Sequence, residues 1–296
     1  MLFVPNGGND FAVTASYSAS RPGTTTFGSP LTSSAISTAN NYGAQYIPLG
    51  GALQNDSYGM VINVNNNFVG ATFRQLALQF SVDYTGGTNF STGNVIISGL
   101  LGSQAINYQL GGGLWYYFPL FIPSGSRLGV TGRGSTTAAP IPGIAVKFLT
   151  SPSNPSMVKR GAFVETIGLT LGAGTVTGVS VTPSTAVNEP NTWTLIGTTT
   201  NRLWSWQVGC QHSDTTMTLL NYHVDIGVGT STTVVEPILT DQFVETSATE
   251  QFTTIPVVGG VEKVVPAGSQ IYARVHNAGT NENAGSFQVV VYGTGG

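Results

Sequence analysis

Two aspartates at matching places in the chain have the setting that comes closest to a metal or catalytic site. Asp83 and Asp225 each follow a valine, and His223 lies two residues before the second aspartate. Imidazole and carboxylate groups both bind transition metals, so the spacing of His223 and Asp225 suggests a metal site there. The first segment has Ser81 in place of the histidine. The structural alternative, which we favour, is that each aspartate ends a strand and accepts hydrogen bonds from amides of the glycine-rich turn that follows.

Known catalytic motifs are absent from the sequence. It has no His-Glu-x-x-His, no Gly-x-Ser-x-Gly, no Gly-Lys-Ser/Thr phosphate loop and no Gly-x-Gly-x-x-Gly after a strand. Paired carboxylates for glycoside cleavage need two acids close together, and 57–150 contains Asp83 alone. We therefore expect a protein that is not an enzyme and that needs no metal or other cofactor.

Aromatic residues offer a second kind of site. Trp204 and Trp206 lie two apart, so in a strand they would share one face and could stack on a sugar or contact a protein. Packing in the core is the commoner use of such residues.

The elements that must position these residues occur twice. Residues 76–88 (LALQFSVDYTGGT) match 218–230 (TLLNYHVDIGVGT), 123–130 (PSGSRLGV) match 266–273 (PAGSQIYA), and 143–148 match 286–291. The shift is 142 residues for the first pair and 143 for the other two. Such a long period indicates duplication of a domain rather than a solenoid.

The Pro-x-Gly-Ser segments precede an expected strand in both copies. Pro123 and Pro266 fix the entry to the turn, and Gly125 and Gly268 supply a backbone conformation that other residues reach only with strain. We interpret all four as structural turn residues.

Short β-branched and aromatic runs separated by Gly and Pro turns predict strands throughout. We expect an all-β fold with two tandem antiparallel β-sandwich (jelly-roll-like) domains and an extended N-terminal arm. The expected boundaries are an arm at 1–56, a first sandwich at 57–150, a linker at 151–160, and a second sandwich with a leading hairpin at 161–296.

The predicted arm has almost no charge and carries aromatic residues at intervals, namely Phe3, Phe11, Tyr17, Phe27, Tyr42 and Tyr46. This pattern is typical of a segment that becomes ordered by lying on another surface. We expect these aromatics to provide much of the attachment to a partner. On this interpretation, deleting residues 1–55 would leave both sandwiches folded and weaken binding.

Charge narrows the classes of partner. Charged residues make up 8% of the 296 residues, against a hydrophobic share of 41%, so the surface suits large contacts with protein or sugar. The net charge is +3 over 57–150 and −7 over 161–296. Neither half has the basic stripe that nucleic-acid binding requires.

The remaining sequence features concern cell compartment. Cys210 is the sole cysteine, so no intrachain disulfide can form. The N-terminus lacks the features of a secretory signal, and the longest apolar run, 114–122, is too short to span a bilayer. We expect synthesis in a host cytoplasm and no membrane partner.

The low-charge arm, the FPLFIPSGSRLGV stretch with its echo VVPAGSQIYARV, and the VDYTGGT/VDIGVGT pair resemble β-rich virion proteins of tailed bacteriophages. The resemblance implies a capsid decoration or cement protein that contacts the major capsid protein or another virion protein and forms homo-oligomers. A carbohydrate- or receptor-binding module of a tail fibre or spike, recognising a surface glycan, is the alternative. A shell-forming capsid protein is the third.

Overall fold

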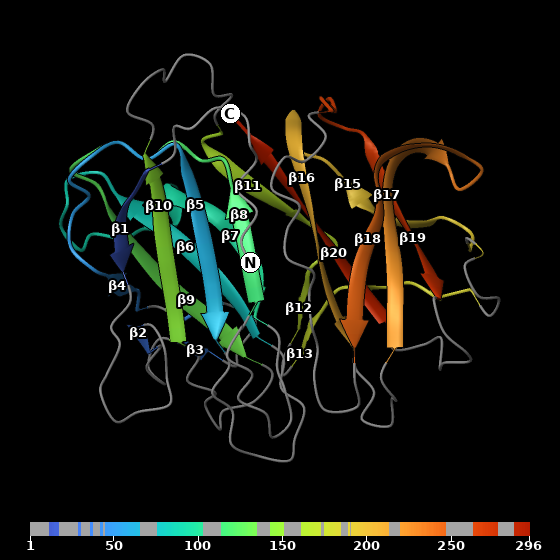
Figure 1. Cartoon of the computed structure of the whole chain (residues 1–296), viewed down its shortest axis with the longest axis horizontal. Coiled ribbons are helices and arrows are strands. Elements are labelled where there is room, and N and C mark those ends of the chain that lie inside the picture. Colours follow the sequence, from blue (N-terminus) through green and yellow to red (C-terminus); the bar gives the residue numbers. More distant parts are fainter. Residues whose placement is uncertain are drawn as a thin grey trace.

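The computed structural model is built almost entirely of strands (Figure 1). It describes residues 12–17, 29–30, 36–37, 42–43, 45–65, 76–102, 114–134, 143–150, 161–172, 175–184, 189, 191–212, 220–246, 263–277 and 287–296. Their one helical element is a short 3-10 turn, η2 (Thr92–Asn94), which confirms the predicted all-β fold. No helix in the described part has the length and apolar character needed to cross a membrane.

The first domain has two sheets. One has the order β1-β10-β5-β8, with β2 beside β10, and the other places β4 and β3 beside β9, followed by β6 and β7. The strands are β1 (Ala12–Tyr17), β2 (Ser29–Pro30), β3 (Ile36–Ser37), β4 (Ile47–Leu49), β5 (Gly59–Asn65), β6 (Leu76–Asp83), β7 (Val95–Gly102), β8 (Leu114–Phe118), β9 (Arg127–Gly134) and β10 (Gly143–Thr150). If the short β2 and β3 are set aside, eight strands remain. Numbered in chain order, strands 1, 8, 3 and 6 (β1, β10, β5 and β8) form one sheet. Strands 2, 7, 4 and 5 (β4, β9, β6 and β7) form the other, and this order is that of a jelly roll.

The second domain repeats this plan. Its sheets are β11-β20-β16, with β14 also on β20, and β15-β19-β17-β18. The strands are β11 (Phe163–Ile167), β14 (Val179–Ser180), β15 (Thr194–Thr198), β16 (Leu203–His212), β17 (Leu220–Ser231), β18 (Val234–Thr246), β19 (Gln270–Asn277) and β20 (Phe287–Gly295). A short hairpin lies between β11 and β14, in which β12 (Thr170–Gly172) pairs with β13 (Thr175–Thr177).

Strand pairing shows where each copy begins. The first strand pairs with the last in both domains, β1 with β10 and β11 with β20. The second jelly-roll strand pairs with the last but one, β4 with β9 and β15 with β19. Each repeat therefore starts at β1 or β11, well before the segments that are repeated in sequence.

The expected N-terminal arm is extended, but its described parts lie in the sheets of the first sandwich. β1 and β2 pair with β10, and β3 and β4 pair with β9. The described parts of 12–49 therefore supply strands of the jelly roll, and the boundary predicted at residue 57 divides that domain. Phe3, Phe11 and Phe27 lie outside the described residues, as does the predicted linker 151–160.

One continuous nine-stranded sheet joins the two domains. β11 pairs in parallel with β7, with Val164 opposite Ile97, and so connects a sheet of the first domain to a sheet of the second. Figure 1 shows β11, β16 and β20 in the part of the second sandwich that lies next to the first. The run FQVVVYGTG makes β20 apolar on both sides, and all nine of its residues are buried.

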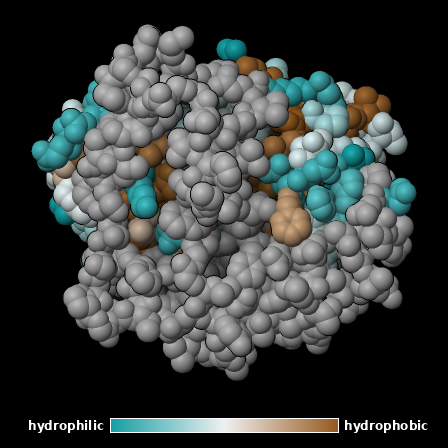
Figure 2. Space-filling model, in the orientation of Figure 1, coloured by the Kyte–Doolittle hydropathy of each residue, from teal (hydrophilic) through white to brown (hydrophobic). Residues whose placement is uncertain are grey.

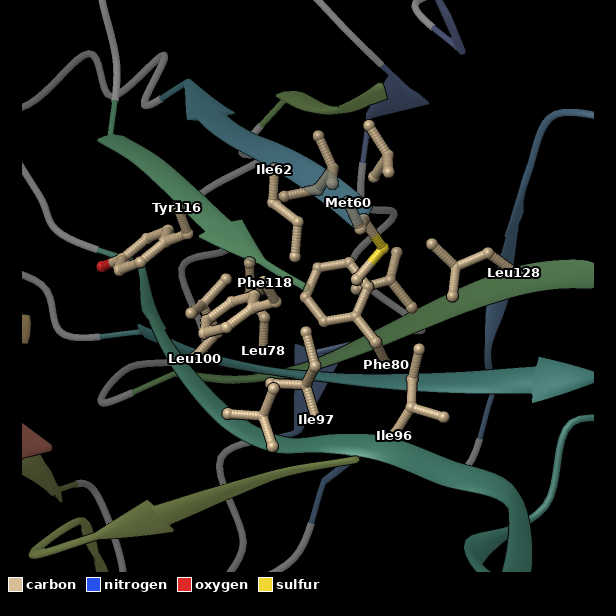
Figure 3. Packing of buried hydrophobic residues seen from close by; sticks show 14 of the residues in the cluster. Met60, Ile62, Leu78, Phe80, Ile96, Ile97, Leu100, Tyr116, Phe118 and Leu128 are labelled. Atoms are coloured by element: carbon tan, nitrogen blue, oxygen red, sulfur yellow. The ribbon is translucent and has the colours of Figure 1, made fainter. Parts of the chain in front are cut away.

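Each domain has its own apolar core, and β20 contributes to both. Val290 and Tyr292 belong to the first core, whereas Val289 and Val291 belong to the second. Figure 3 shows the first core, in which side chains from opposite sheets meet: Met60, Ile62, Tyr116 and Phe118 from one, and Leu78, Phe80, Ile97 and Leu100 from the other.

Candidate functional site

The outer face of the β15-β19-β17-β18 sheet carries a cluster of hydrogen-bonded polar residues. Along β19, Ile271, Ala273 and Val275 enter the second core. Side chains alternate across a strand, so the intervening Gln270, Tyr272, Arg274 and His276 lie on the opposite face. β17 places Asp225 beside Arg274 and His223 beside His276.

Asp225 is the centre of this cluster and is 2% exposed. Its Oδ2 accepts a hydrogen bond from Arg274 Nε at 2.8 Å and lies 2.8 Å from His276 Nε2. Its Oδ1 accepts a hydrogen bond from the backbone N–H of Asp241 at 2.9 Å. One carboxylate thus ties together β17, β18 and β19.

The electrostatics of the cluster favour the charged carboxylate. Burial alone would raise the pKa of Asp225, but hydrogen bonds from Asp241 N–H, Arg274 and His276 outweigh it and hold the pKa below its ordinary value. Asp241 itself has a φ of 55°, and the β17–β18 register shifts between Val224 and Ile226. This bulge directs the Asp241 amide at Asp225.

Aromatic and aliphatic side chains surround the polar centre. The Trp193 ring lies 4.5 Å from the Arg274 guanidinium carbon, and His223 contacts Phe243 edge to face with centroids 5.7 Å apart. Leu195 of β15 pairs with Tyr272 of β19 and is 43% exposed, and Phe243 is 42% exposed. Figure 2 shows hydrophobic and hydrophilic residues intermingled on its right-hand side, where Figure 1 places the second domain. We call the outer face of this sheet, with Trp193, Leu195, Phe243 and Arg274, the distal face.

The two aspartates singled out from the sequence have different roles. Asp83 ends β6 and accepts hydrogen bonds from Thr85 N, Thr85 Oγ1 and Asn89 N, at 2.6–2.9 Å. The Thr85 side chain and amide, together with the Asn89 amide, lower the pKa of Asp83. This matches the predicted turn.

For Asp225 the predicted turn is wrong. β17 continues past it to Ser231. In 225–230 (DIGVGT), Ile226 and Val228 alternate with single glycines, so the strand can continue, whereas 83–88 (DYTGGT) has adjacent glycines that favour a turn.

The Pro-x-Gly-Ser turns match in detail. Gly125 has a φ of 81° and Gly268 a φ of 80°, which is the left-handed region that favours glycine. Gly125 N donates to Leu53 O, and Gly268 N donates to Thr199 O. In return Leu53 N donates to Ser126 O and Thr199 N to Ser269 O. Pro123 and Pro266 thus open equivalent turns, which are hydrogen-bonded to the segments that precede β5 and β16.

Trp204 and Trp206 are buried, with 6% and 3% of their surface exposed. Trp206 belongs to the second core and donates from Nε1 to Lys263 O at 2.9 Å. A bulge between Leu203 and Ser205 interrupts the alternation that would otherwise place both rings on one face. Their burial agrees with core packing, and neither offers an open ring to a sugar. Tyr17 lies at the end of β1.

The sequence did not single out Trp193, Asp241, Arg274 or His276 as site residues. The signal for Arg274 and His276 was the period-two row on β19, in which polar residues alternate with Ile271, Ala273 and Val275. The described residues contain no group of three His, Cys, Asp or Glu side chains arranged to hold a metal. Cys210 is buried, and burial raises the pKa of its thiol, so it is unsuited to act as a thiolate.

Several chains of solved structures match this one, among them two distant likenesses. No family model and no curated protein matches the chain. The structure of PNGF-II aligns at 11% identity and a TM-score of 0.33, covering 97% of this chain and 66% of that one. The structure of infectious bursal disease virus, Gx strain, aligns at 11% identity and a TM-score of 0.23, covering 83% of this chain and 58% of that one. The chain thus spans under two thirds of either, and at these TM-scores neither bears on function.

Proposed function

We propose that this protein is a non-enzymatic structural component of a virus particle, which decorates or cements a phage capsid through contacts with the major capsid protein or another virion protein. The observation that carries the proposal is the pair of jelly rolls joined through one sheet. Jelly rolls recur in viral capsid proteins as well as in lectins, so this step is an analogy of fold.

Composition supports the same role. With charged residues at 8% of the chain, broad contacts with another protein desolvate few charges. The polar cluster around Asp225 supports a structural role for that residue, since Arg274, His276 and the Asp241 amide engage its carboxylate.

Imaging of particles tests the proposal. Virions of the phage that encodes this chain would be compared by cryo-electron microscopy with virions from a strain in which the gene is deleted. We expect density for two tandem jelly rolls on the outer capsid surface of the parent, missing from the deletion particles, and restored when purified protein is added.

Other placements would contradict the proposal. Absence of the protein from virions would overturn the structural role altogether. Density at the tail, accompanied by glycan binding of the purified protein, would favour the receptor-binding alternative. Closed shells formed by the purified protein alone would favour a shell-forming capsid protein.

A further inference from the structure

The second domain covers two features of the first domain. β11 lies along the edge strand β7, and the β12–β13 hairpin lies over the outer face of the sheet that contains β9. Arg133 on β9 is fully buried and donates to the carbonyls of Gly172 and Thr175 in that hairpin. Leu169, which leads into the hairpin, packs over Gly99 of β7.

The equivalent features of the second domain are open among the described residues. β18 is the counterpart of β7, and no described strand pairs with its outer edge. Phe80 pairs with Ile97 in the first domain, and the matching Tyr222 pairs with Val244 in the second. Val244 is therefore the equivalent of Ile97, the residue of β7 that pairs with β11. The distal face beside it exposes Leu195 and Phe243.

The first domain has a strand that fits this open edge. β1 is the counterpart of β11, since each pairs with the last strand of its own domain. β11 has a second partner, β7, whereas the described pairing of β1 is with β10 alone. Within the described residues, β1 of the first domain and β18 of the second therefore each lack the partner that β11 and β7 find in one another.

We propose that a second copy of this chain docks on the distal face and β18. The first domain of that copy would lie against the second domain here as the second domain lies against the first within one chain. The proposal extends the junction within the chain and does not depend on a virion role. Such a head-to-tail contact is heterologous, so it builds chains or rings rather than a two-fold dimer.

Charge complementarity favours this direction. The first domain region 57–150 has a net charge of +3 and the second domain region 161–296 a net charge of −7. Glu236 and Asp241 are exposed on β18, whereas β10 places Lys147 beside β1. Contact between the first domain of one copy and the second domain of another brings opposite charges together, and contact between two second domains does not.

Features of β18 limit how much backbone pairing can form. Pro237 has no N–H to donate, and Asp241 lies in a bulge. Strand addition is therefore confined to the stretch around Val244, as the β7–β11 pair is itself short. Side chains of the distal face must supply much of the contact.

Sedimentation velocity of the full chain across a micromolar range tests the proposal. The weight-average mass of the unaltered protein should rise with concentration through several species. The paired substitution Phe243→Asp with Leu195→Asp should weaken association by about tenfold or more. The control is Tyr84→Asp, at a residue that is 51% exposed in the first domain, and it should not change association.

Zero-length crosslinking of a mixture of ¹⁴N- and ¹⁵N-labelled protein then gives the direction. Mixed-isotope links should join carboxylates of β18 to Lys147. A monomer at every concentration overturns the proposal. Association that survives Phe243→Asp with Leu195→Asp in folded protein also overturns it, as do mixed links that join second domains only to each other.

Discussion

At the scale of single residues, Asp83 and Asp225 show how one motif acquires two uses. Both follow valine in matching segments, yet Asp83 organises a turn while Asp225 braces three strands. A buried carboxylate is costly unless its partners are in place, so Asp225 makes the arrangement of β17, β18 and β19 depend on Arg274 and His276.

We expect Asp225→Asn to lower the free energy of unfolding by about 2–3 kcal/mol, because Arg274 and His276 lose a charged acceptor that is buried. Asp83→Asn should cost less, since an amide oxygen can still accept the turn hydrogen bonds. Urea denaturation of the two variants measures the difference. An Asp225→Asn variant as stable as the parent would contradict the bracing role.

The same carboxylates predict a dependence of stability on pH. Their pKa values are lower in the folded protein, so as pH falls the unfolded chain takes up protons first, near the ordinary aspartate pKa of about 3.9. Their stabilisation is complete above that pH and is lost as pH falls toward the folded values. The melting temperature should drop below about pH 4, and less steeply in Asp225→Asn. Equal slopes for parent and variant would exclude Asp225 as a contributor.

At the scale of elements, the two Pro-x-Gly-Ser turns are a matched pair. A Cβ added at Gly125 or Gly268 meets no atom within 4 Å, so alanine there adds backbone strain without a clash. We expect Gly125→Ala and Gly268→Ala each to cost about 1 kcal/mol. Gly51→Ala is the control, because its Cβ also has open space and its φ is not positive. Chemical denaturation that gives all three variants the same stability would rule out strain at the turns.

The sequence predicted the turns and the repeated strands because each has a local signature. Proline and glycine mark the turns, and large apolar residues at every second position mark β10, where Ile144, Val146 and Phe148 are buried. It did not predict the role of residues 12–49, because strands as short as β2, β3 and β4 carry no periodic signal and are held by pairing with β9 and β10. The register of strand pairing could not be predicted either, since the contact of Asp225 with Arg274 depends on how far β17 extends.

At the scale of the whole molecule, the two domains form one body because β20 is shared. Tyr292 packs edge to face against Tyr116 and Phe118 of β8, and its Oη accepts a hydrogen bond from Leu101 N at 2.9 Å. On the other side of the same strand, Val289 and Val291 fill the second core. Loss of either core therefore removes packing from a strand of the other.

This connection alters what truncation should do. Deleting residues 1–55 removes β1, β2, β3 and β4, and so takes strands from both sheets of the first sandwich. We expect the truncated protein to unfold at a much lower temperature than the parent, in contrast to the expectation for a separable arm. The second domain should be destabilised with the first, because β11 and β20 lose a well-packed neighbour. Hydrogen exchange followed by mass spectrometry measures this in both domains. Unchanged protection of β5, β6 and β10 in the truncated chain would mean that the first sandwich folds without its N-terminal strands.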